Sequence, residues 1–372
     1  MRRTAPLHKG STGLCSIHGN PSKTILQGHA GMDNCKKWAE ALIGKPIVAF
    51  DRAAAGRNSR VFRARTADGA AYALKQYLVT PERNGLETEF SALQFLHTNG
   101  IGKIPRAIAC DRTHHLAVYD FIEGAPVGDA VAPNDLDAAV EFVLVLDRLS
   151  QSNPAWKTNA AEACFALNDA IENINARLRR LTSLREDSPP FCELRAFLET
   201  DLLPLFDGIV QWATESAARE GLSMNSPIET SERILSPSDF GFHNALRRTD
   251  GEIVFFDFEF FGWDDPAKLI SDFLLHPGMS LDDDRRKRFV KRLCSELRNG
   301  HSVAKRLPMA YSLFAVKWCA ILLNEFIPEH LARRRFAGDS RDEKAILSGQ
   351  LDKARRMAGQ IANTYRDFPY GD

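Results

Sequence analysis

The sequence lacks the features that mark thiolate-rich or nucleic-acid-binding proteins. Its seven cysteines lie far apart, and no two of them have the C-x-x-C spacing of a zinc or redox site. Their odd number and wide spacing predict reduced thiols, as is usual in the cytoplasm. The 48 basic and 48 acidic residues balance, so the overall charge gives no reason to expect a nucleic-acid partner.

A long apolar segment is also missing. The most apolar stretch, 313–323, is interrupted by Lys317 and is shorter than the ~20 residues that cross a bilayer. The N-terminus carries Arg2 and Arg3 but no apolar core of a signal peptide. We therefore expect no membrane span and a cytoplasmic location.

The first residues show no hydrophobic period and are rich in Gly, Ser, Thr, His and Lys. This composition predicts a disordered tail over 1–35, within which Met32 is a second possible start. The segment 19–24 superficially resembles a phosphate-binding P-loop. It lacks the second glycine, however, and Pro21 has no amide hydrogen to offer a phosphate, so we reject a P-loop there.

Residues 36–121 predict a small antiparallel sheet that carries one helix. Asp68-Gly69 separates two apolar runs, which is a signal for a hairpin. Apolar residues then recur at helical spacing until Asn99-Gly100 ends the run. The expected strands are 61–65, 71–75, 107–110 and 116–121, and the expected helix is 82–98.

The remaining residues, 122–372, predict a larger and mainly helical part. The expected helices are 134–151, 160–183, 191–219, 281–298, 307–330 and 341–366, with a region of loops and a strand at 233–262. A chain of 372 residues suits one large domain or two closely packed ones. The fold class expected from this order is α+β, with a small sheet lobe and a larger helical lobe.

Three oxygen-bearing side chains gather in the loop-and-strand region. Asp239 is followed five residues later by Asn244 and thirteen residues after that by Asp257. Phosphoryl transfer needs a group that orients the attacking hydroxyl and accepts its proton, and it needs hard oxygen ligands that hold Mg²⁺. The spacing therefore predicts Asp239 as the catalytic base, with Asn244 and Asp257 as the metal ligands.

Each of these residues also has an ordinary structural explanation. Asp239 and Asn244 lie near Gly241 and could form turns, while Asp257 could cap a strand. Asp257 and Glu259, however, lie inside an aromatic run, where carboxylates are costly unless they are paired or coordinated. The complete spaced set therefore favours a functional site.

A lysine and a glutamate further upstream form a second candidate group. Lys75 ends an apolar strand, and Glu89, fourteen residues later, lies on the inward face of the predicted helix. Such a pair holds the ammonium where it can bind α- and β-phosphate oxygens of a nucleotide. Glu87 is the alternative partner, and a solvated helix face is the structural alternative for the pair.

The segment 56–62 suits a loop that covers the nucleotide phosphates. Gly56 and Asn58 permit a tight turn with exposed backbone amides, and Ser59 follows directly. Because only one glycine is present, a plain hairpin loop is the alternative.

With these motifs in this order, residues 45–330 resemble the aminoglycoside phosphotransferase and choline kinase group of protein-kinase-like small-molecule kinases. The resemblance implies a two-lobed protein-kinase-like fold with ATP and Mg²⁺ in the cleft. It also implies that 118–124, with Asp120 and Ile122, is the hinge whose backbone binds the adenine edge. An active member would move the γ-phosphate to a hydroxyl of a small molecule.

The chain departs from this family pattern in two places. The family usually has His-Gly before the catalytic aspartate, where this chain has Pro237-Ser238, and Asp272 comes later after Pro266 than is common. The retained base and metal ligands favour an active enzyme, and a weak or inactive nucleotide-binding scaffold is the alternative. A protein kinase is disfavoured, because no Ala-Pro-Glu segment and no long activation loop follow Asp257.

The phosphoryl acceptor and the oligomeric state stay open. Aminoglycosides, choline-like amino alcohols, sugars and lipid- or polysaccharide-linked alcohols all remain candidates. Asp264, Asp265 and Asp272 would favour a cationic acceptor if they formed an acidic pocket, and they have a structural role otherwise.

Overall fold

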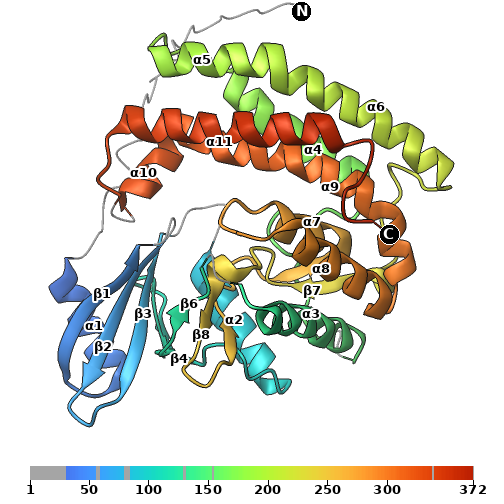
Figure 1. The fold of residues 1–372 in the computed structure, drawn as a ribbon. Coiled ribbons are helices and arrows are strands. Elements are labelled where there is room, and N and C mark those ends of the chain that lie inside the picture. The colour runs from blue at the N-terminus through green and yellow to red at the C-terminus, as the bar shows by residue number, and fades with distance from the viewer. Residues whose placement is uncertain are drawn as a thin grey trace, which may run out of the picture.

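The protein folds into a sheet lobe and a larger helical lobe, as Figure 1 shows for the computed structural model. The structure describes residues 31–55, 59–78, 84–128, 131–152, 155–336 and 339–371. The sheet lobe is antiparallel and the second lobe is mainly helical, so the expected α+β class is confirmed.

The sheet lobe contains five strands in the spatial order β1-β2-β3-β5-β4, and all neighbouring strands are antiparallel. Its hairpin between β2 and β3 turns at Asp68-Gly69, where Gly69 has a φ of 84° that favours glycine. The strands are β1 (Ile47–Ala55), β2 (Ser59–Thr66), β3 (Ala71–Tyr77), β4 (Ala107–Asp111) and β5 (Leu116–Asp120).

Two helices belong to this lobe. The predicted one is α2 (Gly85–Thr98), which begins at Asn84, whose side chain accepts a hydrogen bond from the Glu87 amide. The other is α1 (Met32–Ile43), which packs against β1, β4 and β5 through Cys35 and Ala39. The structure thus places residues 32–35 in a helix rather than in the tail predicted over 1–35, and it does not describe residues 1–30.

The helical lobe contains the predicted helices, but two of them are interrupted by other helical turns. Helix 191–219 is continuous but contains a π-helical turn, η2 (Leu198–Leu202), between α5 and α6. The predicted helix 307–330 divides into α9, a 3₁₀ turn η5 (Leu323–Phe326) and α10. The α-helices are α3 (Pro133–Ser152), α4 (Leu167–Thr182), α5 (Pro189–Phe197), α6 (Leu203–Arg219), α7 (Pro266–Leu275), α8 (Asp283–Glu296), α9 (Gly300–Leu322), α10 (Pro328–Phe336) and α11 (Glu343–Thr364).

Short strands of the helical lobe hold the segments where the candidate residues lie. One sheet has the order β6-β8-β9 and another pairs β7 with β10. At Gly262 a Cβ would come within 2.3 Å of the backbone at Asn159, so only glycine fits this close approach. The strands are β6 (Ala125–Pro126), β7 (Ile234–Ser236), β8 (Ala245–Arg247), β9 (Ile253–Phe255) and β10 (Gly262–Asp264), and η3 (Thr230–Glu232) and η4 (Phe242–Asn244) are 3₁₀ turns.

Helix α9 forms the centre of the helical lobe and packs against α4, α6, α7, α8 and α11. Together with η5 it is the one stretch of the described residues that is long and apolar enough to cross a membrane. Because 83% of its most apolar window is buried inside the protein, its composition is explained by its place in the core.

The two lobes are connected along the chain and by a separate contact. The chain leaves the sheet after Asp120, and we propose that the lobe boundary lies between residues 121 and 122. On β2, the Arg60 Nε donates to the Phe336 carbonyl of α10 at 3.0 Å, and its guanidinium lies 4.1 Å above the Phe336 ring centroid. A strand of the sheet lobe thus contacts a helix near the C-terminus.

Candidate active site

Lys75 of β3 joins the two lobes through a buried ion cluster. Its Nζ donates to Glu89 Oε2 on α2 at 2.6 Å and to Asp257 Oδ1 at 2.7 Å, and Glu259 Oε2 lies 3.8 Å away. Lys75 is only 7% exposed. Burial by itself would lower the pKa of Lys75, but Asp257, Glu89 and Glu259 outweigh it and raise the pKa well above its usual value. The lysine is therefore protonated at neutral pH.

Several groups fix Glu89 in this position. The Tyr77 hydroxyl donates to Glu89 Oε2 at 2.6 Å and shares a further hydrogen bond of 2.6 Å with Tyr119, while the Phe258 amide donates to Glu89 Oε1 at 3.2 Å. The alternative partner, Glu87, pairs with Arg112 at the surface instead. Glu89 is therefore the helix residue that contacts Lys75.

Asp257 follows β9 in a conformation that is unusual for aspartate. Its φ of 69° lies in the left-handed region, where non-glycine residues are uncommon and occur often at functional sites. Burial, together with the nearby carboxylates of Glu259 and Glu89, raises the pKa of Asp257 to about 7 despite the opposing effect of Lys75. The carboxyl group is held where its negative charge is not fully balanced.

Asp239 lies in the loop after β7 and contacts two histidines. His243 Nε2 is 3.0 Å from Asp239 Oδ1, and His276 Nε2 is 3.8 Å from the same oxygen. The two imidazole rings are stacked with their centroids 3.5 Å apart. At Gly241 a Cβ would come within 2.8 Å of His243 Nδ1, so the glycine leaves room for this ring.

The histidines keep Asp239 ionised. The Gly278 amide donates to His276 Nδ1 at 3.1 Å, so the proton of the neutral ring lies on Nε2, which faces Asp239. Burial would raise the pKa of Asp239, but the hydrogen bond from His243 and the nearby His276 lower it well below its usual value. Such a carboxylate suits the orientation of a hydroxyl and a late proton transfer.

Asn244 connects Asp239 with Asp257. Its side-chain Nδ2 donates to the backbone carbonyl of Asp239 at 2.9 Å. Its backbone carbonyl accepts a hydrogen bond of 3.0 Å from the Phe256 amide. Because the amide nitrogen is used, the side-chain oxygen of Asn244 remains for a cation. The loop, β9 and Lys75 thus form one chain of contacts from Asp239 to Glu89.

The donor set fits a divalent metal ion. The carboxylate oxygens of Glu89, Asp257 and Glu259 lie within 4.8 Å of one another, and the lysine ammonium balances only one of their charges. Carboxylate and amide oxygens are the protein ligands that Mg²⁺ prefers. Asp257 belongs to this set, and its raised pKa reflects negative charge that such an ion would neutralise. The role of Asn244 and Asp257 as Mg²⁺ ligands stays a prediction.

The chain has recognisable relatives among phosphotransferases. The model of the phosphotransferase enzyme family matches residues 50–304, which is more than half of the chain. The chain belongs to this family. No curated protein matches the sequence significantly.

Solved structures of small-molecule kinases share the fold of this phosphotransferase at low sequence identity. A spectinomycin phosphotransferase has a TM-score of 0.61 at 13% identity, with 90% of this chain and 98% of that chain covered. The choline kinase LicA of Streptococcus pneumoniae has a TM-score of 0.57 at 13% identity, with 88% and 99% covered. An ethanolamine kinase of Plasmodium vivax has a TM-score of 0.55 at 13% identity, with 89% and 96% covered. These similarities confirm the kinase-like fold.

The remaining predicted site residues of the phosphotransferase include three within the described residues, and these lie at or just beyond strand ends. Gly56 and Asn58 are outside the described residues, and Ser59 is buried at the start of β2, opposite Tyr77 of β3. Asp120 ends β5, and its Oδ1 accepts a hydrogen bond from the Arg106 amide at 2.5 Å. Ile122 is the second residue beyond β5. Their contact with a nucleotide stays a prediction.

The segment that is predicted to be the hinge is fixed to the sheet. The Phe121 amide donates to the Ala71 carbonyl at 3.3 Å, and the Arg63 guanidinium lies 4.3 Å above the Phe121 ring. Arg63 also pairs with Glu123. The backbone that would meet the adenine edge is therefore anchored on both sides of Ile122.

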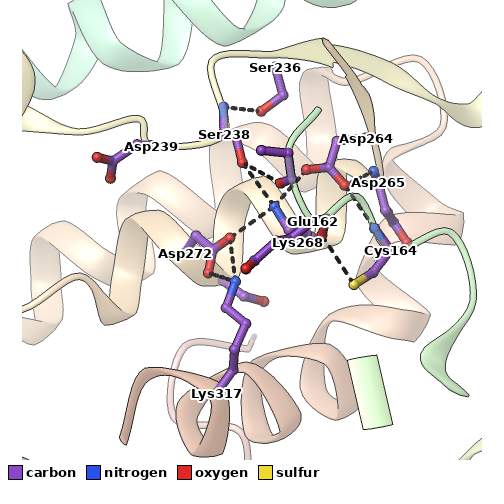
Figure 2. A network of polar contacts seen from close by, with 12 residues as sticks. Glu162, Cys164, Ser236, Ser238, Asp239, Asp264, Asp265, Lys268, Asp272 and Lys317 are labelled. Carbon is purple, nitrogen blue, oxygen red and sulfur yellow. Dashed lines mark hydrogen bonds and ion pairs between the residues drawn. The ribbon is translucent and has the colours of Figure 1, made fainter. Parts of the chain in front are cut away.

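Sequence reasoning did not predict the partners of the acidic residues that follow Asp257. Figure 2 shows Asp264 and Asp272 turned toward Lys268, with Lys317 on the far side of Asp272. Asp265 pairs with Arg306 instead. These carboxylates pair with cations inside the protein, which favours the structural role, and their part in an acidic pocket for a cationic acceptor stays a hypothesis.

His276 is a further residue that sequence reasoning missed. It directly follows α7, and its ring lies over His243 and beside Asp239. Its edge also contacts the Trp318 ring at a centroid distance of 4.8 Å. No spacing rule links 276 to 239, so only the tertiary structure brings them together.

Proposed function

We propose that this phosphotransferase uses ATP with Mg²⁺ and moves the γ-phosphate to a hydroxyl group of a small molecule. The observation that carries the proposal is the contact of Lys75 with both Glu89 and Asp257. It brings a phosphate-binding ammonium to within 2.7 Å of a carboxylate that suits a metal ion. The solved relatives support nucleotide binding, since the spectinomycin phosphotransferase was crystallised with ADP and LicA with AMP.

Each residue has a definite task in this proposal. Lys75, oriented by Glu89, binds phosphate oxygens of the nucleotide, and Asn244 and Asp257 hold Mg²⁺. The metal ion neutralises charge on the phosphates when it is bound. Asp239 accepts a hydrogen bond from the acceptor hydroxyl, aims the oxygen at the γ-phosphorus and takes the proton as the new bond forms.

The hinge and the phosphate loop complete the nucleotide site. We place the adenine edge against the backbone near Asp120 and Ile122, which is anchored to the sheet as described above. The loop with Gly56, Asn58 and Ser59 would cover the phosphates from the sheet side. The cytoplasmic location expected from the cysteine pattern stays a prediction.

The proposal is tested by ADP release from the purified protein with a panel of hydroxyl acceptors. The panel should include aminoglycosides, choline and ethanolamine, sugars, and lipid- or polysaccharide-linked alcohols. Asp239→Ala should remove turnover while the protein remains folded, as seen by circular dichroism, because the hydroxyl then lacks its orienting group. Turnover that survives this change would contradict the assigned role of Asp239.

A second candidate function is a nucleotide-binding scaffold with little or no turnover. Pro237-Ser238 in place of His-Gly before Asp239 is the observation that favours it. A scaffold would bind ADP with Mg²⁺, but it would not form ADP from ATP with any acceptor. Calorimetric binding together with the acceptor panel therefore separates the two candidates.

A further inference from the structure

Lys268 lies at the centre of a buried ion network directly beneath the loop that carries Asp239. It is 2% exposed, and its Nζ lies 2.6 Å from Asp264 Oδ2 and 3.2 Å from Asp272 Oδ2. The same nitrogen donates to Ser238 Oγ at 3.3 Å (Figure 2). The lysine therefore links the ion network to the residue that precedes Asp239.

Ser238 has a strained backbone and a fully used side chain. Its φ of 66° is left-handed, which costs a non-glycine residue on the order of 1 kcal/mol or more. Its hydroxyl accepts from Lys268 and donates to the Ala161 carbonyl at 3.4 Å, and its amide donates to Ser236 Oγ at 2.9 Å. The side chain thus joins the catalytic loop to two other segments and offsets the strain.

The direction of the Lys268 ammonium is itself fixed. Asp264 Oδ1 accepts hydrogen bonds from the Cys164 amide at 3.3 Å and the Asp265 amide at 3.0 Å, so the carboxylate cannot rotate freely. Asp272 is held in turn by Lys317 at 2.9 Å and by Trp318 Nε1 at 2.8 Å. Asp264, which is the nearer of the two carboxylates and is fixed by backbone amides, therefore aims the lysine at Ser238 without depending on Lys317.

We propose that Lys268 is a positioning residue that holds Asp239 in place through Ser238. The pair supports the loop where this chain has Pro237-Ser238 in place of His-Gly, and the inference rests on the proposed phosphotransfer function. Glycine at 238 would adopt the left-handed conformation without strain, so the serine is explained by its hydroxyl rather than by its backbone. Within the described residues Lys317 contacts Asp272 but not the loop, so the two lysines have separable roles.

The direct test replaces Ser238 with glycine, which keeps the backbone conformation and removes the contact. We expect Ser238→Gly to lower kcat about tenfold or more, because small displacements of a positioned group are costly, and to leave the KM for ATP unchanged. Amide hydrogen exchange in 236–244 should become faster. Wild-type kcat together with wild-type exchange in Ser238→Gly would overturn the proposal.

Lys268 is tested by a charge-balanced double variant, Lys268→Met with Asp264→Asn, which removes a buried ion pair without leaving an unpaired charge. Its kcat should fall as in Ser238→Gly, and combining all three changes should lower kcat no further, because both act through one contact. Additive losses would show that Lys268 acts independently of Ser238 and would overturn the proposal.

Lys317→Met is the matched control, since it removes a lysine from the same network without touching the loop. It should reduce stability and leave kcat per folded molecule and the exchange of 236–244 unchanged. A kcat loss equal to that of Ser238→Gly would overturn the specific role of Lys268. If wild-type protein shows no turnover with any acceptor, the proposed function fails, and the exchange measurements alone then decide whether the Lys268–Ser238 contact orders the loop.

Discussion

The protein contains two buried lysine–carboxylate clusters that differ in charge balance. Around Lys75 one ammonium faces three carboxylates, and the pKa of Asp257 is raised to about 7. Around Lys268, three cations, Lys268, Lys317 and Arg177, face three carboxylates, Asp264, Asp272 and Glu162. The two lysines outweigh burial to lower the pKa of Asp272, whereas burial leaves the pKa of Asp264 raised. The first cluster carries an excess of negative charge, whereas the charges of the second cluster balance without a ligand.

This difference separates a binding site from a support. An unbalanced buried cluster is unfavourable in the free protein and becomes favourable when a cation arrives. A balanced cluster gains nothing from a ligand, and its members serve to hold the elements that carry them. Equal burial and equal chemistry thus do not imply equal function, and the count of charges distinguishes the two clusters.

The largest expected effect comes from removing a charge in the unbalanced cluster. Asp257→Asn should lower kcat for phosphotransfer by about 10²–10³-fold, because a group that stabilises transition-state charge is lost. The melting temperature should stay equal or rise, since a carboxylate of raised pKa is removed from a site selected for activity. Steady-state kinetics and calorimetry measure both quantities. A marked fall in melting temperature would contradict the assignment of the Lys75 cluster as unbalanced.

Removing a charge from the balanced cluster around Lys268 should lower stability rather than activity. Lys317→Met leaves Asp272 with less positive charge around it, and we expect a loss of about 3 kcal/mol in the free energy of unfolding. Urea denaturation measures this loss, and kcat per folded molecule should remain within about twofold. If Lys317→Met leaves stability unchanged, the network around Lys268 is not the support that we describe.

Two glutamates on α2, one buried beside Lys75 and one at the surface, should differ in their effect on activity when they are replaced. Glu89→Gln weakens the hold on Lys75 and should lower kcat/KM about 10–100-fold, as is usual for residues that orient a ligand-binding group. Glu87→Gln removes only a surface pair with Arg112, which is worth less than about 1 kcal/mol, and should leave kcat/KM within about twofold. Equal effects of the two changes would disprove the distinct role of Glu89.

The smallest effect concerns pH. With a pKa of about 7 in the free protein, the Asp257 carboxyl is mostly protonated at pH 6 and mostly ionised at pH 8. Because a metal ion binds the ionised form, the affinity for ADP with Mg²⁺ should rise several-fold, up to about tenfold, from pH 6 to pH 8. Calorimetric titration at three pH values measures this change, and Asp257→Asn should abolish the pH dependence.

The residues of the Lys75 cluster were largely predictable from the sequence. Lys75 and Glu89 lie on elements with clear periodicity, and Asp257 and Glu259 are conspicuous within an aromatic run. What the sequence did not show is that all four meet, because the contact of Asp257 with Lys75 spans 182 positions and depends on how the lobes pack.

The Lys268 cluster was not predicted, for a physical reason. Every residue of α7 is buried, including Lys268 and Asp272, so no solvent-exposed face distinguishes these charged residues from surface residues in the sequence. Lys268 and Asp272 are four residues apart on α7, whereas Asp264 lies on β10 before the helix and Lys317 comes from α9. Helix α1 lies where the sequence predicted the end of the tail, and it buries Cys35 and Ala39, which are four residues apart.

The contact between Arg60 and Phe336 limits how the two lobes can move. The chain after Asp120 and the ion pair of Lys75 with Asp257 also join the sheet lobe to the helical lobe, and Arg60 adds an attachment on β2, on the other side of β3 from β5. Lobes that are joined at several separate places resist rotation about the chain that connects them. We therefore expect that a wide opening of the cleft would have to break the contact between Arg60 and Phe336, whereas a small change in the angle between the lobes would preserve it.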